Sequence, residues 1–161
     1  MTPLRDDRYL DALAAQSALL TEALRGTDLQ QRVPTCPEWT LYQLAEHVGQ
    51  AHRGVTELII RRSTAPPDFS TLRKAAAPED PDKLGTWLRD GASELVGAIR
   101  AAGPRTPVWS WTDDQSVGFW TRRMAHETAV HRADVELALG RVFALDTDLA
   151  ADAISEWLGA L

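Results

Sequence analysis

A glutamate and a histidine one helical turn apart are the residues of this sequence best suited to chemistry. Glu127 and His131 lie in a stretch without proline or glycine between Gly118 and Gly140, which predicts one continuous helix. An imidazole on the inward face with a carboxylate four residues before it is half of a metal site or half of an acid–base pair. At about 100° per residue, the inward face of this helix comprises Val117, Trp120, Met124, Thr128, His131, Val135 and Ala138, with Glu127 at its flank.

Simpler interpretations of the same helix stay open at this point. Glu127 could pair with Arg123 on the helix surface, and His131 could be a hydrogen-bonded core histidine. His126 points about 160° away from the apolar face, so we expect it to face solvent. Asp134, three residues after His131, could accept a hydrogen bond from a metal-ligating imidazole.

The missing ligand would have to come from another helix. His47 and His52 lie in a second predicted helix, roughly 70° to either side of its apolar face, and periodicity does not choose between them. Two histidines and one glutamate suit zinc, and also nickel, cobalt or iron. Three protein ligands leave an open position, which is typical of a catalytic site and can hold water or a thiol in deprotonated form. Since the histidines must be neutral, metal affinity should weaken as pH falls through roughly 6.5.

The elements that must position these groups are helical. Apolar periodicity and capping signals predict helices over 5–25, 41–62, 81–102, 117–140 and 147–160. The linker 63–80 contains three prolines and should be a long crossover on the surface. The strongest strand-like segment, 108–111, is too short to found a sheet. We therefore predict an all-α fold: a four-helix bundle with a long crossover and a short C-terminal helix.

Composition restricts the classes of protein that remain. A chain of 161 residues, 44% hydrophobic and 25% charged, fits one globular domain over 1–161. A net charge of −6 without a basic patch argues against nucleic acid and anionic membranes as partners. There is no apolar run of about 18 residues and no hydrophobic signal core. With the single cysteine, Cys36, this predicts a cytoplasmic protein without a disulfide framework.

Two connectors contain aromatic residues and the cysteine. Trp109 and Trp111 precede the helix of Glu127 and are the better candidates to line a pocket. Cys36 stands between prolines without a neighbouring base and should be a buried small residue. The simplest expectation for the other tryptophans is the core: Trp39, Trp87, Trp120 and Trp157.

Two motifs resemble one known family. The first is Val33–Thr40 (VPTCPEWT) leading to Leu44–Val48 (LAEHV), and the second is Arg123–Asp134 (RMAHETAVHRAD). Both are similar to the metal-binding N-terminal domain of the mycothiol-dependent maleylpyruvate isomerase family, and the segment 152–158 also looks like that family's ending. The resemblance implies a DinB-like four-helix bundle and a divalent metal, usually zinc, held by His47, Glu127 and His131. It thereby favours His47 over His52.

The resemblance also implies a reaction class. The metal would activate a low-molecular-weight thiol, mycothiol, which adds to an electrophilic double bond and leaves after rotation, or is transferred. Trp109, Trp111 and Arg123 are then candidates to bind the thiol or its small-molecule substrate. Better-known members continue into a second, C-terminal domain, so either the family's front domain stands alone here or this sequence is part of a longer protein. Loss of that domain would remove a wall of the substrate pocket, which puts maleylpyruvate in doubt as the substrate. The competing hypotheses are a thiol-independent metal enzyme, such as a hydrolase or Lewis-acid catalyst, and a non-catalytic ligand-binding bundle. The oligomeric state stays open.

Overall fold

Five helices and one small hairpin make up the protein in the computed structural model, which describes residues 3–67 and 76–159. The helices are α1 (Asp6–Leu24), α2 (Leu41–Arg61), α3 (Pro81–Ala102), α4 (Val117–Ala138) and α5 (Thr147–Gly159). The hairpin consists of β1 (Arg32–Val33) and β2 (Cys36–Thr40). The prediction of an all-α, DinB-like bundle is confirmed, and each predicted helix is present with bounds that differ by at most two residues.

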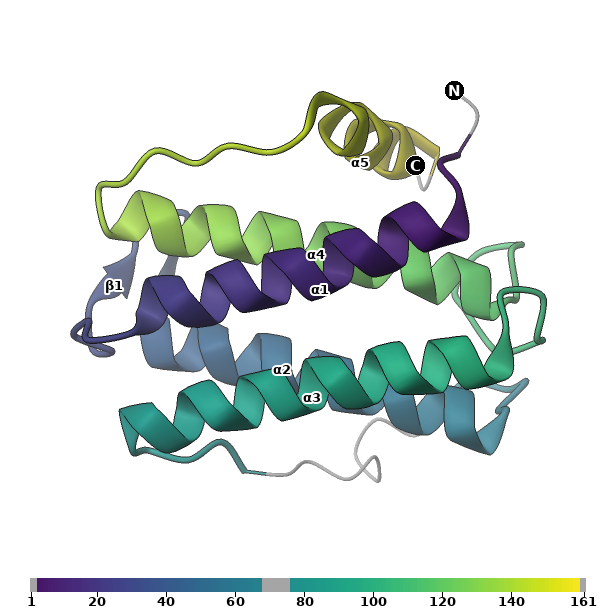
Figure 1. Ribbon diagram of the computed structural model, residues 1–161, viewed down its shortest axis with the longest axis horizontal. Helices are drawn as coiled ribbons and strands as arrows, with labels where there is room; N and C mark the ends of the chain where they lie inside the picture. Colours follow the sequence, from purple (N-terminus) through teal and green to yellow (C-terminus); the bar gives the residue numbers. More distant parts are fainter. Residues whose placement is uncertain (1–2, 68–75, 160–161) are drawn as a thin grey trace.

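The four long helices form a bundle in which neighbours along the chain do not simply alternate in direction. α1 packs against α4 and α3, and α2 packs against α3 and α4 (Figure 1). The colours in Figure 1 show that α1 and α4 run one way, and α2 and α3 the other. Because α2 and α3 are parallel, the connection between them must return along the length of the bundle, as the predicted crossover requires. Part of that connection lies outside the described residues.

Local side-chain caps determine where three of the long helices begin. Thr40 and Gln43 form the predicted capping box at the start of α2, with each side chain bonded to the other's backbone N–H. Asp80 accepts hydrogen bonds from the backbone N–H groups of Asp82 and Lys83 at the start of α3. Pro81, the first residue of the helix, has no N–H that would need a partner. Ser116 caps α4 by accepting from the backbone N–H of Phe119. The caps fix the register of α2 and α4, and with it the directions of His47, Glu127 and His131.

The connector before α2 contains the small sheet that the sequence did not predict. β1 and β2 pair antiparallel through a shift in register, and the backbone N–H groups of Leu41 and Tyr42, at the start of α2, donate to the carbonyls of Gln31 and Leu29 just before the hairpin. Cys36 is half-buried within the hairpin, so the prediction of a buried cysteine is only partly right. The segment 108–111 forms no strand, and Pro107 makes a single bridge to Ser116.

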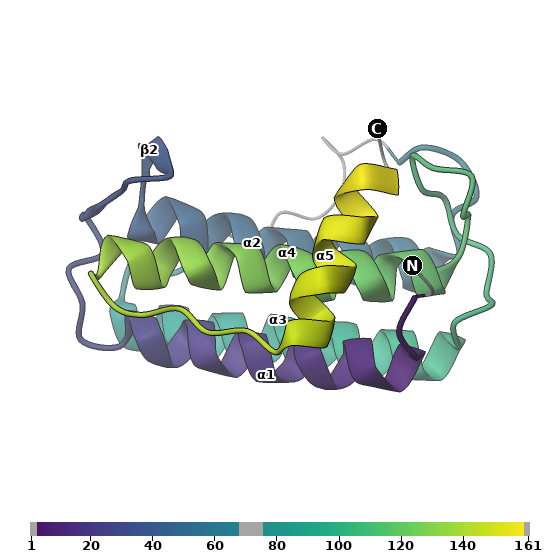
Figure 2. The ribbon, with the colours of Figure 1, turned by 90° about the horizontal axis from the view of Figure 1, so that it is seen from above.

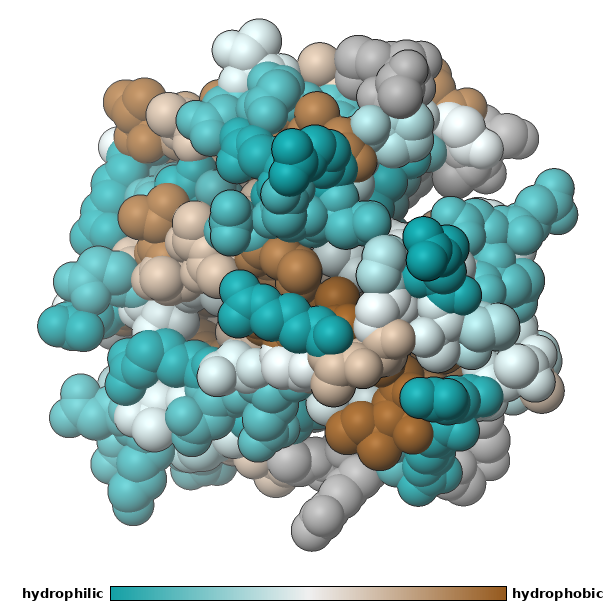
Figure 3. All heavy atoms as spheres, turned by 45° about the vertical axis from the view of Figure 1, so that its right-hand side comes forward, coloured by the Kyte–Doolittle hydropathy of each residue, from teal (hydrophilic) through white to brown (hydrophobic). Residues whose placement is uncertain are grey.

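The core is divided into two clusters along the bundle axis. One gathers around Leu13, Leu95 and Trp120, and the other around Leu20, Leu44 and Val135, so the inward face of α4 contributes to both. The surface in Figure 3 is largely polar, with exposed apolar side chains in small separate groups. None of the helices among the described residues is long and apolar enough to cross a bilayer.

Helix α5 crosses the outside of the bundle over α1 and α4 (Figure 2). It buries Leu149, Asp152 and Glu156, a mostly polar stripe at i, i+3 and i+7. Trp157 is 59% exposed, so the expectation of a core tryptophan is wrong there. The reason is that α4 presents Arg122, Arg123 and His126 to α5, and the polar face of α5 therefore turns inward.

Candidate metal centre

Three side chains from two helices converge on one point of the bundle surface. α2 supplies His47, and α4 supplies Glu127 and His131. The Nε2 atoms of both histidines lie 3.2 Å from Oε1 of Glu127, and the three potential ligand atoms are all within 4.8 Å of one another. The side chain of His47 is 40% exposed, whereas that of His131 is 12% exposed. The group is therefore reachable from solvent on one side and enclosed on the other.

The second oxygen of Glu127 is engaged elsewhere. Arg123, one turn earlier on α4, donates to Oε2 of Glu127, as the simpler interpretation of the sequence allowed. The same guanidinium donates to Glu156 of α5 across 3.2 Å. One oxygen of Glu127 therefore faces the two histidines and the other accepts from the Arg123 guanidinium, which Glu156 of α5 holds in place.

His131 is oriented by a second carboxylate. Its Nδ1 lies 3.0 Å from Oδ2 of Asp134, which confirms the predicted contact at i+3. Thr35, in the turn between β1 and β2, donates to the other oxygen of Asp134 across 2.6 Å. The motif Val33–Thr40 therefore does more than connect two helices. Its Thr35 orients the Asp134 carboxylate, which in turn orients the His131 imidazole.

Trp39 forms an aromatic wall beside the cluster. Its ring centroid lies 4.9 Å from that of His47 and 6.2 Å from that of His131. The residue is half-buried and packs against the second core cluster, so the expected core role holds only in part. An indole at this distance restricts the rotation of His47 and shields one side of the imidazoles from water.

Charge strongly couples the members of the cluster. Burial alone would lower the pKa of His131, but its hydrogen bonds to Asp134 and Glu127 outweigh burial and raise the pKa to about 9. Burial would raise the pKa of Glu127, and the bonds from His131, His47 and Arg123 instead hold it far below the usual range. At neutral pH the metal-free cluster therefore contains an imidazolium between two carboxylates, and a cation that enters must displace the proton on Nε2.

The other two histidines are buried away from this point. His52 donates from Nε2 to Oγ1 of Thr128 across 2.9 Å, because that hydroxyl gives its own proton to the carbonyl of Met124. Burial lowers the pKa of His52 to about 4. His126 is 1% exposed and bonds to Asp152 across 2.8 Å, so the prediction that it faces solvent is wrong. α5 covers the face of α4 that periodicity predicts to be exposed, and its Asp152 provides the carboxylate that His126 binds.

The predicted pocket residues divide in the structure. Trp111 and Arg123 line a pocket of about 280 Å³ beside Glu127, whereas Trp109 packs against the first core cluster and accepts from Trp120 Nε1 at its carbonyl. Phe119, Glu156 and Trp157 complete the described lining. The pocket thus shares Glu127 with the candidate metal centre. Whether Trp109, Trp111 and Arg123 bind a thiol stays a prediction.

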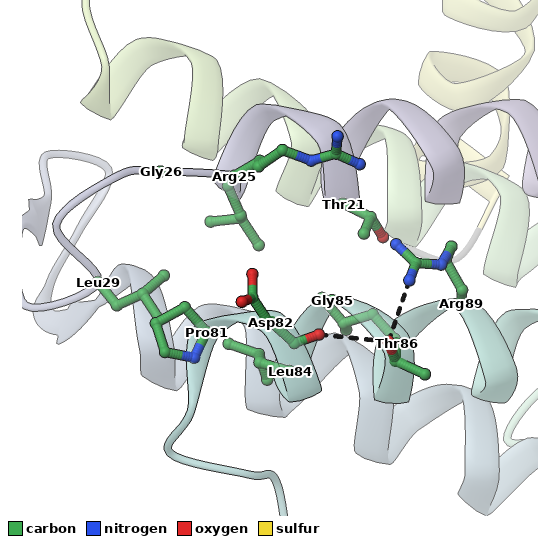
Figure 4. A pocket seen from close by; sticks show the side chains of 12 residues that line it. Thr21, Arg25, Gly26, Leu29, Pro81, Asp82, Leu84, Gly85, Thr86 and Arg89 are labelled. Carbon is green, nitrogen blue, oxygen red and sulfur yellow. Dashed lines mark hydrogen bonds between the residues drawn. The ribbon is translucent and has the colours of Figure 1, made fainter.

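A separate hollow of about 330 Å³ lies between the end of α1 and the start of α3 (Figure 4). Arg89 donates to Thr86 there, and Arg25 pairs with Glu22. Among the lining residues that the structure describes, Asp82 is the one carboxylate, and there is no histidine or cysteine. This hollow therefore lacks a donor set for a transition metal.

Sequence reasoning missed four residues around the site. Thr35 and Trp39 come from the hairpin, and Asp152 and Glu156 come from α5. No helical periodicity could have found the first two, although both stand in the motif that carries the family resemblance. The carboxylates of α5 were visible only as polar residues on a short amphipathic helix.

A family model matches most of the chain. Residues 10–136 match the family model described as mycothiol maleylpyruvate isomerase N-terminal domain, and the match includes His47, Glu127 and His131. No curated protein and no solved structure matched the chain. The matched segment covers most of the sequence, and the chain belongs to the mycothiol maleylpyruvate isomerase N-terminal domain family.

Proposed function

We propose that this protein is a metal-dependent enzyme that activates a low-molecular-weight thiol, mycothiol, for isomerisation of a small electrophile or for transfer to it. The observation that carries the proposal is the convergence of His47, Glu127 and His131 on one point beside a pocket. The family supports a mycothiol-associated, metal-binding domain, and the finer assignment of reaction is ours. We further propose zinc as the metal, with nickel, cobalt or iron as alternatives, and a cytoplasmic location.

The donor set suits a small divalent cation. Two ligands bonded at roughly 2.0–2.1 Å to a tetrahedral ion lie about 3.3 Å apart, and the two separations between imidazole Nε2 and Glu127 Oε1 are 3.2 Å. Imidazole and carboxylate ligands favour zinc and its neighbours over calcium or magnesium. Three protein ligands leave room for one more, and His47 is the ligand open to solvent.

The surrounding residues hold the ligands in place. Asp134 accepts from Nδ1 of His131, so Nε2 is the nitrogen free to ligate. Arg123 binds one oxygen of Glu127 and leaves the other for the cation. Trp39 packs against the ring of His47 and excludes water from that side. When bound, a divalent cation would lower the pKa of a coordinating thiol and favour its thiolate.

The reaction requires an electrophile next to the sulfur. In isomerisation, the thiol sulfur forms a bond to one carbon of a conjugated double bond, the resulting single bond rotates, and loss of the thiol restores the double bond. In transfer, the carbon–sulfur bond remains and the neighbouring carbon takes up a proton. The pocket of about 280 Å³ shares Glu127 with the metal centre and is the place for that electrophile.

The test begins with the metal. Elemental analysis of the purified protein should find one zinc per chain, and replacement by cobalt should give a visible spectrum of a tetrahedral site. Addition of mycothiol should then produce a sulfur-to-cobalt charge-transfer band. Glu127→Gln should abolish both spectra, while the exposed Glu22→Gln, the same chemical change on α1, should leave them intact.

Each outcome assigns the protein to one hypothesis. A charge-transfer band together with turnover of an electrophile only in the presence of mycothiol would support the proposal. Stoichiometric metal with activity that ignores added thiol would replace it with a thiol-independent metal enzyme. A folded protein that takes up no metal would leave a non-catalytic ligand-binding bundle.

A further inference from the structure

The pocket beside Glu127 has aromatic walls and a floor of paired charges. Trp111 and Phe119 are in edge-to-face contact with ring centroids 5.1 Å apart, and the guanidinium of Arg123 lies 5.9 Å from the ring of Trp157. Trp111 and Trp157 are 56% and 59% exposed, so both indoles are available to a ligand. Exposed indoles facing a pocket near a charged floor are suited to an aromatic or otherwise flat apolar group.

The positive charge of Arg123 in this pocket is already paired with carboxylates. Arg123 pairs with Glu127 and with Glu156, so one positive charge faces two carboxylates. Arg122, the next residue of α4, is held by both oxygens of Asp152. Among the lining residues that the structure describes, none brings a further cation. In the metal-free protein these side chains leave the pocket short of positive charge, and a ligand carboxylate would have no partner to replace its water.

Glu156 adds a second, independent feature. It is 8% exposed, and its Oε1 atom is buried with no hydrogen-bond partner among the described residues, while Oε2 accepts from Arg123. A buried carboxylate oxygen without a partner is costly and gains from a donor. Because Glu156 is part of the pocket lining, a ligand with an N–H or O–H group next to its apolar part is the kind that would supply such a donor.

We infer that this pocket binds the uncharged, hydrogen-bond-donating part of the substrate and discriminates against carboxylates. The inference rests on the proposed function insofar as it takes the pocket to hold the electrophile. It also separates this chain from an enzyme acting on maleylpyruvate, which carries carboxylates. The electrophile would instead be a neutral, flat molecule such as a conjugated amide.

A matched pair of probes tests the discrimination directly. Benzamide and benzoate have the same size and ring, and they differ in charge and in the N–H donors. The indole N–H resonances of Trp111 and Trp157, assigned through Trp→Phe variants, report binding to the full chain at pH 7. Titrations are made with the metal-free protein, after chelation and without any thiol. Failure of thiol activation therefore cannot be mistaken for failure of the pocket.

Benzamide should shift both resonances until saturation, and benzoate should bind at least roughly tenfold more weakly to the metal-free protein. Glu156→Gln removes one carboxylate from Arg123 and should raise benzoate affinity to equal or exceed that of benzamide. Glu22→Gln, the same change at an exposed site on α1, should leave the ratio unchanged. If Glu156→Gln does not fold, Trp157→Ala removes an exposed wall and should weaken benzamide binding at least about fivefold. Equal or tighter binding of benzoate to the wild type, or no response of the two indoles to benzamide, would overturn the inference.

Discussion

Two opposite faces of α4 each combine a histidine with a carboxylate, but the two groups differ in arrangement. On one face, Glu127 meets His131 of the same helix and His47 of α2. On the other, Asp152 of α5 meets His126 and Arg122. Each cluster has a carboxylate and an imidazole, yet only the first gathers three potential ligands around one point.

The difference lies in how completely protein donors satisfy each carboxylate. Asp152 is fully buried and accepts from Tyr9, Arg122 and His126 within 2.7–3.0 Å, which leaves it no capacity for a metal. Glu127 is less buried, and two imidazole nitrogens lie 3.2 Å from its Oε1. A metal ion could replace these hydrogen bonds by binding the oxygen and both nitrogens. A saturated, closed cluster stabilises the fold, whereas an open cluster of the same residue types can bind.

The largest effect on zinc binding should come from exchanging His131, and the same exchange of His126 on the other face gives the comparison. His131→Gln should lower zinc affinity by roughly a hundredfold or more, because it removes one of three ligands. His126→Gln should retain zinc but reduce the free energy of unfolding by about 2 kcal/mol, since a buried bond to a carboxylate is lost. Competitive zinc titration and urea denaturation of the two variants give the comparison. Equal loss of zinc in both variants would mean that the clusters are not separate.

Asp152→Asn tests whether the closed cluster is structural. Arg122 and His126 would lose their shared anion, which should cost about 3 kcal/mol of stability, as for a buried pair deprived of one partner. Asp148→Asn is the matched control on the same helix, because its pair with Arg8 is exposed to solvent and should contribute little to stability. Thermal and urea unfolding measure both variants. Unchanged stability in Asp152→Asn, or loss of zinc with stability intact, would contradict a purely structural role.

Helical periodicity predicted the fold and half of the site because those features depend on local spacing. The inward face of α4, the capping box at Thr40 and the contact between His131 and Asp134 each depend on residue spacing within a single helix or at its end. Spacing within α2 could not choose between His47 and His52, since both lie off the apolar axis. The structure brings His47 to Glu127 and buries His52 against Thr128.

The wrong predictions share one physical cause, which is a partner distant in sequence. His126 was expected in solvent and Trp157 in the core, because apolar periodicity assumes that helices bury their hydrophobic stripe. α5 instead buries Asp152 and Glu156 against the basic residues of α4. Pairing across 26 to 33 residues, as in His126–Asp152 and Arg123–Glu156, leaves no periodic signal in either segment.

Proton competition at His131 should make metal binding depend on pH well above the range expected from an ordinary histidine. Its pKa of about 9 in the metal-free protein means that zinc must displace a proton at pH 7. Zinc affinity should therefore rise about tenfold for each pH unit up to about 9 and then level off. Zinc titrations from pH 6 to 10, corrected for zinc hydrolysis, measure the slope. A plateau already reached at pH 7 would show that His131 is neutral there.

Stability of the metal-free protein should respond to pH with opposite sign on the two faces. The raised pKa of His131 gives stability that is complete below about pH 6.5 and is lost as pH rises through about 9. Burial lowers the pKa of His126 despite its bond to Asp152, so its contribution is present above about 6.5 and declines as pH falls. Urea unfolding as a function of pH should show the alkaline loss disappear in His131→Gln and the acid loss shrink in His126→Gln.

The smallest effects should come from the residues that orient His131. Asp134→Asn should weaken zinc binding by roughly 10-fold to 100-fold, because the imidazole loses the anion that fixes its ring and raises its basicity. Thr35→Val removes only the donor to Asp134 and should weaken zinc binding less than Asp134→Asn does.

Competitive zinc titration at pH 9 and at pH 7 separates two consequences of Asp134→Asn. At pH 9 the lost orientation dominates, whereas at pH 7 the lower pKa of His131 partly compensates by reducing proton competition. An equal loss at both pH values would mean that Asp134 orients the ring without setting its pKa.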